Sequence, residues 1–159
     1  MPRMPRMPKI AEWGDIWVLV LLAILASGTA LMQNRHKPLG VDDIAIREVI
    51  LQQVRAFSVE DGPMAFSFAA PDLQTQFETP DYFMEMIKAH YRPVYFAQKV
   101  DFSSPARPLR EDESMRLQSV FLVDDRGASH KARYLMQKQP DRSWKIAGCH
   151  LLTSDLVDI

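Results

Sequence analysis

The sequence predicts an α+β domain in which three N-terminal helices pack on a curved antiparallel sheet, preceded by one N-terminal membrane helix. Three observations lead to this prediction. Residues 16–26, IWVLVLLAILA, form an apolar run without charge. Residues 43–92 repeat apolar side chains at intervals of three and four, which is typical of amphipathic helices. From residue 94 onward, apolar and polar residues alternate between short turns, as expected for antiparallel strands.

The composition is that of an ordinary globular domain. The chain has 159 residues, of which 47% are hydrophobic and 25% charged. The formal net charge of −1 and the absence of a basic cluster from the domain argue against a nucleic acid as partner. Cys149 is the only cysteine, so the chain cannot form an internal disulfide and the core must be stable without one.

The apolar run predicts a membrane anchor. The uncharged stretch 16–32 has 17 residues, the lower limit for a helix that spans a bilayer. Three basic residues precede it, as in a signal peptide or a positive-inside anchor. We therefore expect residues 1–37 to be an anchor or signal segment with its linker, membrane contact through residues 13–33, and a domain over 38–159.

Two alternatives to a retained anchor stay open. The small residues at 26–30 suit a signal peptidase, and cleavage there would release a secreted domain. The run can also be a buried core helix. With a retained single-pass anchor, we expect the domain to lie in the periplasm or outside the cell.

Three helices are expected after the linker. The first, from about residue 43, places its apolar residues on one face: Ile46, Val49, Ile50, Val54 and Phe57. The sequence Glu60-Asp61-Gly62 interrupts it, and a short apolar helix follows at 63–70 with Asp61 or Gly62 as its N-cap. Thr79 caps the third helix, which Arg92-Pro93 ends. Residues 73–78 read as a short strand.

The second half of the chain predicts a sheet. Strands are expected at 94–103, 115–123, 129–138 and 144–152, with a loop or ragged sheet edge at 105–113. Turns are expected at 124–127, where Gly127 suits a positive φ, and at 139–143. Gly148 interrupts the last strand and predicts a bulge.

Three stretches of the chain resemble a known family. They are QQVRAFSVEDGPMAFSFAAPDLQ, FMEMIKAHYRPVY and YLMQKQPDRSWKIAGC. They are similar to domain-of-unknown-function family 4864, within the nuclear-transport-factor-2-like (cystatin-like) superfamily, over about residues 43–152. This resemblance implies a cone-like fold with a sheet wrapped over helices. It brings no established reaction and no catalytic residues, because the superfamily includes isomerases, hydratases and cyclases as well as binding and assembly modules.

A cone of this kind can hold a pocket between sheet and helices, although most of its inward aromatic residues are expected to be core. The pocket candidates are Phe83, Tyr95, Asp101, Tyr134, Trp144 and His150. Most acidic residues fall in turns or at helix ends, where capping or solvation explains them. We therefore predict no catalytic residue, no metal ligand and no cofactor.

The favoured function is a non-enzymatic binding or assembly module, either exported or tethered to the membrane. Its expected partners are the membrane and either a second copy of the chain or an envelope protein. The alternative is a pocket enzyme or carrier, similar to the superfamily isomerases, for a small apolar ligand. The sequence does not decide between these classes.

Overall fold

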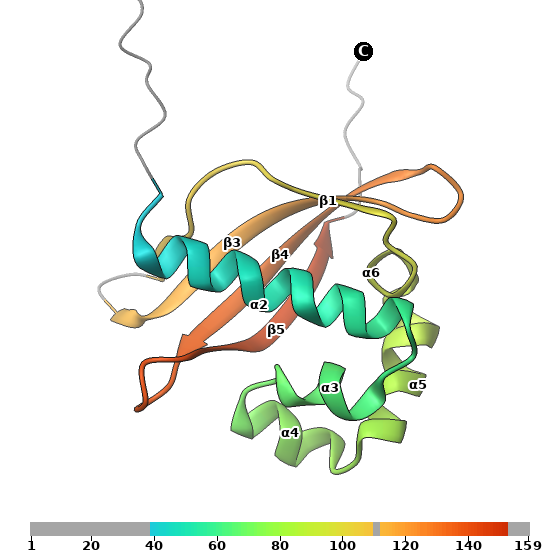
Figure 1. Cartoon of the computed structure of the whole chain (residues 1–159), viewed down its shortest axis with the longest axis horizontal. Coiled ribbons are helices and arrows are strands. Elements are labelled where there is room, and N and C mark those ends of the chain that lie inside the picture. Colours follow the sequence, from blue (N-terminus) through green and yellow to red (C-terminus); the bar gives the residue numbers. More distant parts are fainter. Residues whose placement is uncertain (1–38, 110–111, 153–159) are drawn as a thin grey trace, which may run out of the picture. The chain divides into compact units, whose positions relative to one another are not determined.

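The structure, a computed structural model, describes residues 39–109 and 112–152. These residues form an α+β fold with five helices and a curved antiparallel sheet, as Figure 1 shows. The predicted anchor, residues 13–33, lies outside them. In the part of the chain that the structure describes, no helix combines the length and the apolar character that crossing a bilayer requires.

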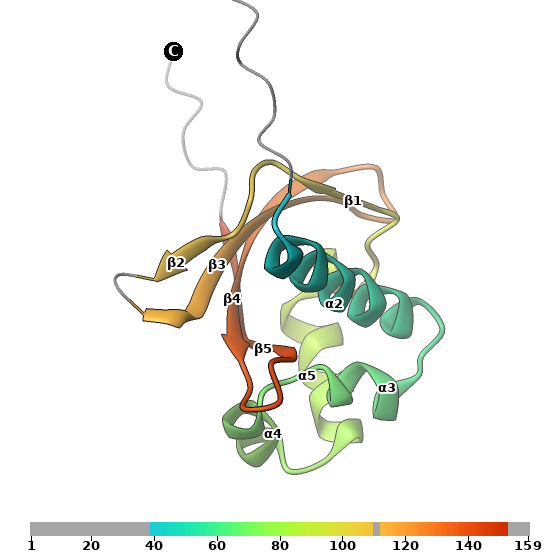
Figure 2. The same ribbon diagram turned by 60° about the vertical axis from the view of Figure 1, so that its left-hand side comes forward.

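Helix α2 (Val41–Ser58) fills the hollow of the sheet, which curves around it in Figure 2. It forms here because one stripe of the helix is apolar. Ile46 and Ile50 are fully buried, and Phe57 nearly so. Asp43 Oδ2 accepts a hydrogen bond of 3.1 Å from the Gly40 N–H, which stabilises the first turn. The predicted first helix is confirmed.

Helix α3 (Gly62–Ser67) follows after a tight reversal. Glu60 adopts a φ of 54°, and Asp61 Oδ1 accepts from the Met64 N–H at 3.0 Å. A Cβ on Gly62 would lie 3.2 Å from Met84 Cγ, so glycine lets α3 approach α5 closely. The interruption in the sequence is therefore a capped corner between two packed helices, as predicted.

Helix α4 (Pro71–Phe77) replaces the short strand predicted at 73–78, and that prediction was wrong. Pro71 starts the helix because its missing N–H needs no partner in the first turn. Pairing with the sheet is limited to the preceding residues: the Ala70 N–H donates to the Ile146 carbonyl at 2.8 Å, and the Ile146 N–H donates to the Phe68 carbonyl at 2.8 Å.

Helix α5 (Pro80–His90) begins at the predicted cap, where Thr79 Oγ1 accepts from the Tyr82 N–H at 3.3 Å. A further short helix, α6 (Arg92–Tyr95), occupies the predicted start of the first strand. Pro93 lies in its first turn and so begins a helix as well as ending one. The first strand consequently starts at residue 99 rather than 94.

The sheet has the order β1-β3-β4-β5, and β2 also pairs with β3. The strands are β1 (Lys99–Phe102), β2 (Arg107–Leu109), β3 (Asp112–Val123), β4 (Ser129–Lys138) and β5 (Trp144–Leu152). All pairings are antiparallel. The loop predicted at 105–113 contains the short strand β2, which Pro108 confines to the sheet edge.

The structure contains the predicted positive φ at Gly127 and the predicted bulge next to Gly148. Gly127 has a φ of 77° in the turn between β3 and β4. Leu135 pairs with Gly148 and Met136 pairs with Ile146, so Ala147 is an extra residue in β5. This bulge reverses the facing of the residues that follow it.

Candidate functional site

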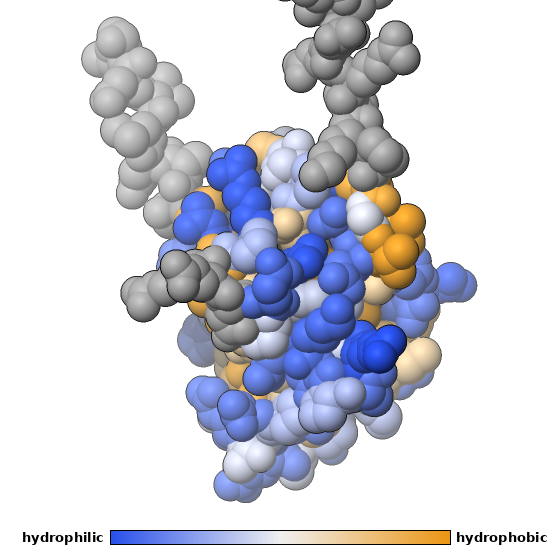
Figure 3. All heavy atoms as spheres, turned by 90° about the vertical axis from the view of Figure 1, so that its left-hand side faces the viewer, coloured by the Kyte–Doolittle hydropathy of each residue, from blue (hydrophilic) through white to orange (hydrophobic). Residues whose placement is uncertain are grey.

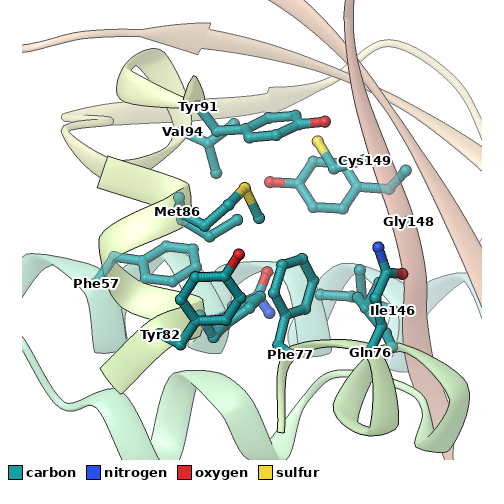
Figure 4. Close-up of a pocket in the computed structure, with 15 residues that line it drawn as sticks. Phe57, Gln76, Phe77, Tyr82, Met86, Tyr91, Val94, Ile146, Gly148 and Cys149 are labelled. Carbon is teal, nitrogen blue, oxygen red and sulfur yellow. The ribbon is translucent and has the colours of Figure 1, made fainter. Parts of the chain in front are cut away.

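A pocket of about 420 Å³ lies between the inner face of the sheet and helices α4 and α5. Figure 4 shows its side chains converging from both sides. The helices and the α5–α6 corner contribute Gln53, Phe57, Leu73, Gln76, Phe77, Tyr82, Phe83, Met86, Ile87, Tyr91 and Val94, and the sheet contributes Tyr134, Ile146, Gly148 and Cys149. Volumes of this size accommodate small organic molecules.

The bulge in β5 determines what the sheet contributes. Ile146 faces the pocket, so without an extra residue the next inward position would be residue 148. Because Ala147 is inserted, Cys149 faces inward instead, opposite the inward-facing Tyr134. The bulge therefore brings a thiol and a phenol to neighbouring positions.

Stacked aromatic rings support the helical wall. The Phe83 ring centroid lies 6.1 Å from that of Phe57 and 5.4 Å from that of Phe77. Tyr95 stacks on the other side of Phe57 at 5.7 Å. Such pairs are stabilised beyond the effect of area burial alone, so these rings stabilise the helical side of the pocket.

Tyr134 is the unusual polar group of the pocket. The residue is completely buried, and its hydroxyl lies beside the weakly hydrogen-bonding thiol of Cys149 but makes no hydrogen bond of good geometry with any described residue. Burial raises the pKa of Tyr134 well above its ordinary value, and the neighbouring Cys149 adds to this shift. Burial also raises the pKa of the Cys149 thiol to about 12. Both groups are therefore protonated at neutral pH.

The remaining lining is neutral. Among the described residues that line the pocket there is no carboxylate, imidazole, ammonium or guanidinium group. The buried Gln53 donates from Nε2 to the Ala65 carbonyl at 3.1 Å, which holds its amide in place. Within residues 39–109 and 112–152, no three His, Cys, Asp or Glu side chains are arranged to hold a metal ion.

The structure divides the six predicted pocket residues into three groups. Phe83 and Tyr134 line the pocket. Tyr95 and Trp144 are buried outside its lining, where the Tyr95 hydroxyl donates to Glu60 at 3.3 Å and Trp144 Nε1 donates to Asp42 at 3.0 Å. The exposed Asp101 and His150 pair with Phe121 and Arg133 on the outer face of the sheet.

Asp101 and His150 face outward for two different reasons. Asp101 lies opposite Phe121, which alternates with the buried Val120 and Leu122. His150 follows Cys149 immediately, so the bulge that turns the thiol inward turns the imidazole outward.

Helix α4 supplies lining residues that the sequence reading missed: Leu73, Gln76 and Phe77. The strand predicted at 73–78 would not place these three side chains on one face, whereas helix α4 does. A signal was present, since Pro71-Asp72 repeats the Pro80-Asp81 pair that starts α5.

Comparison with known proteins gives a match to one protein family. A family model described as a domain of unknown function (DUF4864) matches residues 40–158. No curated protein and no solved structure matches the chain.

Proposed function

Because the chain belongs to the family of domains of unknown function DUF4864, whose name assigns no activity, we propose a function from its pocket: it binds a small, largely apolar molecule that carries one hydrogen-bond acceptor. One observation carries the proposal. The Tyr134 hydroxyl is buried in the wall of an apolar pocket and has no good hydrogen-bond partner among the described residues.

A buried hydroxyl without a partner is costly, since its desolvation is not compensated; the penalty is about 1–3 kcal/mol. A ligand carbonyl or ether oxygen that accepts from Tyr134 removes this penalty. The hydroxyl lies beneath the pocket surface, so lining side chains must move for the ligand to reach it. Met86 is suited to this movement because its unbranched thioether side chain is flexible.

We favour binding or carriage over catalysis. General acid–base chemistry works best with a group whose pKa lies near the operating pH. Two of the lining side chains, Tyr134 and Cys149, have pKa values raised away from neutrality. A protonated thiol is also a poor nucleophile. The pocket is thus suited to holding a neutral molecule.

Two wider proposals accompany this one. The capped corner between α2 and α3, and a curved sheet that holds a pocket against helices, support membership of the nuclear-transport-factor-2-like (cystatin-like) superfamily. The uncharged run at residues 16–32 supports a domain tethered through residues 13–33, on the periplasmic or extracellular side. Signal cleavage and secretion is the alternative.

An assembly role is the second candidate function. Phe121 is 44% exposed on the outer face of the sheet, which is high for a phenylalanine. Partly exposed Leu117 and Leu135 lie on the same face. A second copy of the chain or an envelope protein is the partner we propose for this face.

The ligand proposal is tested with the solvent-sensitive fluorophore prodan, which has a naphthalene body and one carbonyl acceptor. We expect the wild-type protein to bind prodan with a blue shift in emission. Tyr134→Phe keeps the shape of the wall and removes the donor. It should weaken prodan binding roughly five- to tenfold, the effect of one hydrogen bond of about 1 kcal/mol.

Naphthalene, which has no acceptor, is the matched probe. It should bind the wild type and Tyr134→Phe with equal affinity, because it never uses the hydroxyl. If prodan does not bind, or binds both proteins equally, the proposed role of Tyr134 is wrong.

A further inference from the structure

The start of helix α2 exposes aliphatic side chains. Val41 is 86% exposed, Ile44 58% and Leu39 37%. Val41 and Ile44 lie three positions apart in the first turn of the helix, directly after Leu39, and Figure 3 shows an orange patch at its right. We refer to Leu39, Val41 and Ile44 as the α2 patch. Exposed aliphatic residues gathered in this way mark interaction surfaces more often than single ones do.

The two acidic residues that lie between Val41 and Ile44 in the sequence carry little free charge at the surface. Asp42 is paired with Lys138 at 3.1 Å and with Arg116 at 3.3 Å. Asp43 is 8% exposed, and its Oδ1 accepts from the Ala106 N–H at 2.9 Å. A negatively charged partner is therefore not strongly repelled here, although the sequence Val-Asp-Asp suggests the opposite.

The position of the patch in the chain identifies its partner. Met32 is the last residue of the stretch 16–32, and Leu39 begins the described domain seven residues later. A fully extended chain covers at most about 25 Å over that distance. If residues 16–32 enter a bilayer, the surface around Leu39 is the part of the domain held nearest to it. The intervening Arg35 and Lys37 are cations that suit anionic headgroups.

We infer that the α2 patch lies against the surface of an anionic lipid bilayer and fixes the orientation of the domain on it. This inference rests on the proposed tether and not on the proposed pocket ligand. Aliphatic side chains that follow basic residues in the sequence suit an interfacial contact, because aliphatic groups enter the headgroup boundary and cations pair with lipid phosphate. The pocket residues of α4 and α5 lie at the other end of the domain (Figure 1), so the contact leaves them free.

Helix α2 provides its own control for a test. Val59, directly after its last residue, is 67% exposed, and the 18 residues of the helix place it about 27 Å from Val41. The full-length chain is reconstituted into phosphatidylcholine vesicles containing phosphatidylglycerol. An environment-sensitive NBD fluorophore is attached to Val41→Cys or, as the control, to Val59→Cys. Wild-type protein treated in the same way measures background labelling at Cys149.

We expect the label at position 41 to shift to shorter wavelength and to be quenched by lipids spin-labelled near the headgroup. The label at position 59 should stay in water. Adding Ile44→Ser to the Val41→Cys chain should reduce quenching roughly twofold, since one of the contacting aliphatic groups is lost.

Flotation of the vesicles separates the two ways in which the inference can fail. If the chain floats with the vesicles but position 41 is no more quenched than position 59, the tether is present and the patch contact is wrong. If the chain does not float, both are wrong. Shielding of position 41 without vesicles would mean that protein covers the patch, which also overturns the inference. The prodan test of the pocket does not depend on any of these outcomes.

Discussion

Two buried tyrosines in this domain differ mainly in the partner of the hydroxyl. Tyr95 is 5% exposed and donates to Glu60 at 3.3 Å, whereas Tyr134 is completely buried and has no hydrogen bond of good geometry among the described residues. At the scale of single residues, the buried Tyr134 hydroxyl thus lowers the stability of the folded domain. Groups of this kind are expected where a binding site needs a donor that no protein group already occupies.

Replacing each of these two tyrosines by phenylalanine should change the free energy of unfolding in opposite directions. Tyr134→Phe should raise the free energy of unfolding by up to about 1 kcal/mol, because it removes a desolvated hydroxyl for which the weakly hydrogen-bonding Cys149 thiol compensates poorly. Tyr95→Phe should lower it by about 0.5–1 kcal/mol, because a hydrogen bond is lost. Urea unfolding followed by circular dichroism measures both. A loss of stability in Tyr134→Phe would show that its hydroxyl has a good partner in the unliganded protein.

At the scale of elements, Asp42 joins the start of α2 to three strands. It accepts from Trp144 of β5 at 3.0 Å and from Lys138 of β4 at 3.1 Å, and it pairs with Arg116 of β3 at 3.3 Å. The Trp144 hydrogen bond, together with the two cations, lowers the pKa of Asp42 below its ordinary value. One carboxylate therefore holds the helix against the sheet.

This contact should make stability depend on pH. A carboxylate with a lowered pKa binds fewer protons in the folded than in the unfolded chain at acidic pH. Its contribution is complete above the ordinary pKa of about 4 and is lost as the pH falls through the lower folded value. Asp42→Asn should therefore lower the free energy of unfolding by about 1 kcal/mol at pH 7, and the difference from wild type should narrow below about pH 3.

Urea unfolding of both proteins at pH 7 and near pH 2.5 checks this expectation. Glu85→Gln is a suitable control, since Glu85 is exposed on α5 and should change stability little at either pH. An equal loss in Asp42→Asn at both pH values would mean that packing of the side chain, and not its charge, is responsible.

The long elements could be predicted from the sequence, but of the short helices only α3 could, because the Glu60-Asp61-Gly62 interruption and Pro63 mark its start. Helix α2 and strands β3 to β5 carry enough periodic residues to define one buried face. Helices α4 and α6 have seven and four residues, which is too short for a helical repeat of apolar residues to be recognised. Each has a proline in its first turn. Proline both ends and begins helices, so its meaning depends on packing that a sequence pattern does not contain.

Residues of the pocket could be predicted only where a regular strand or helix pattern determines which way a side chain faces. Tyr134 lies in the regular part of β4, and Phe83 on the apolar face of α5, so both could be chosen from the sequence. Beyond the bulge, alternation fails: its exact position decides that Cys149 and not His150 faces inward. The direction in which Asp101 faces depends on which strand lies beside β1, and this is a property of the tertiary structure.

At the scale of the whole molecule, the described residues contain a complete core. The buried cluster runs from α2 through the helices to all three long strands: its members include Ile46, Phe57, Phe83, Leu122, Tyr134 and Ile146. A domain of this size usually has one core and unfolds cooperatively. We therefore predict that this core is stable without residues 16–32, and a test of that prediction separates the anchor and signal interpretations from a buried helix.

A chain that begins at Leu39 should therefore fold without the preceding segment. We expect it to unfold in one cooperative transition, with a urea midpoint equal to that of the full-length protein in mild detergent, because removing a tether leaves the core contacts unchanged. The shortened protein should also bind prodan with unchanged affinity, since every lining residue is retained. A broad transition or exposed hydrophobic surface would show that the apolar run packs into the domain. In that case both the tether and the bilayer contact of the α2 patch would have to be abandoned, while the prodan test of Tyr134 in the full-length chain would stand.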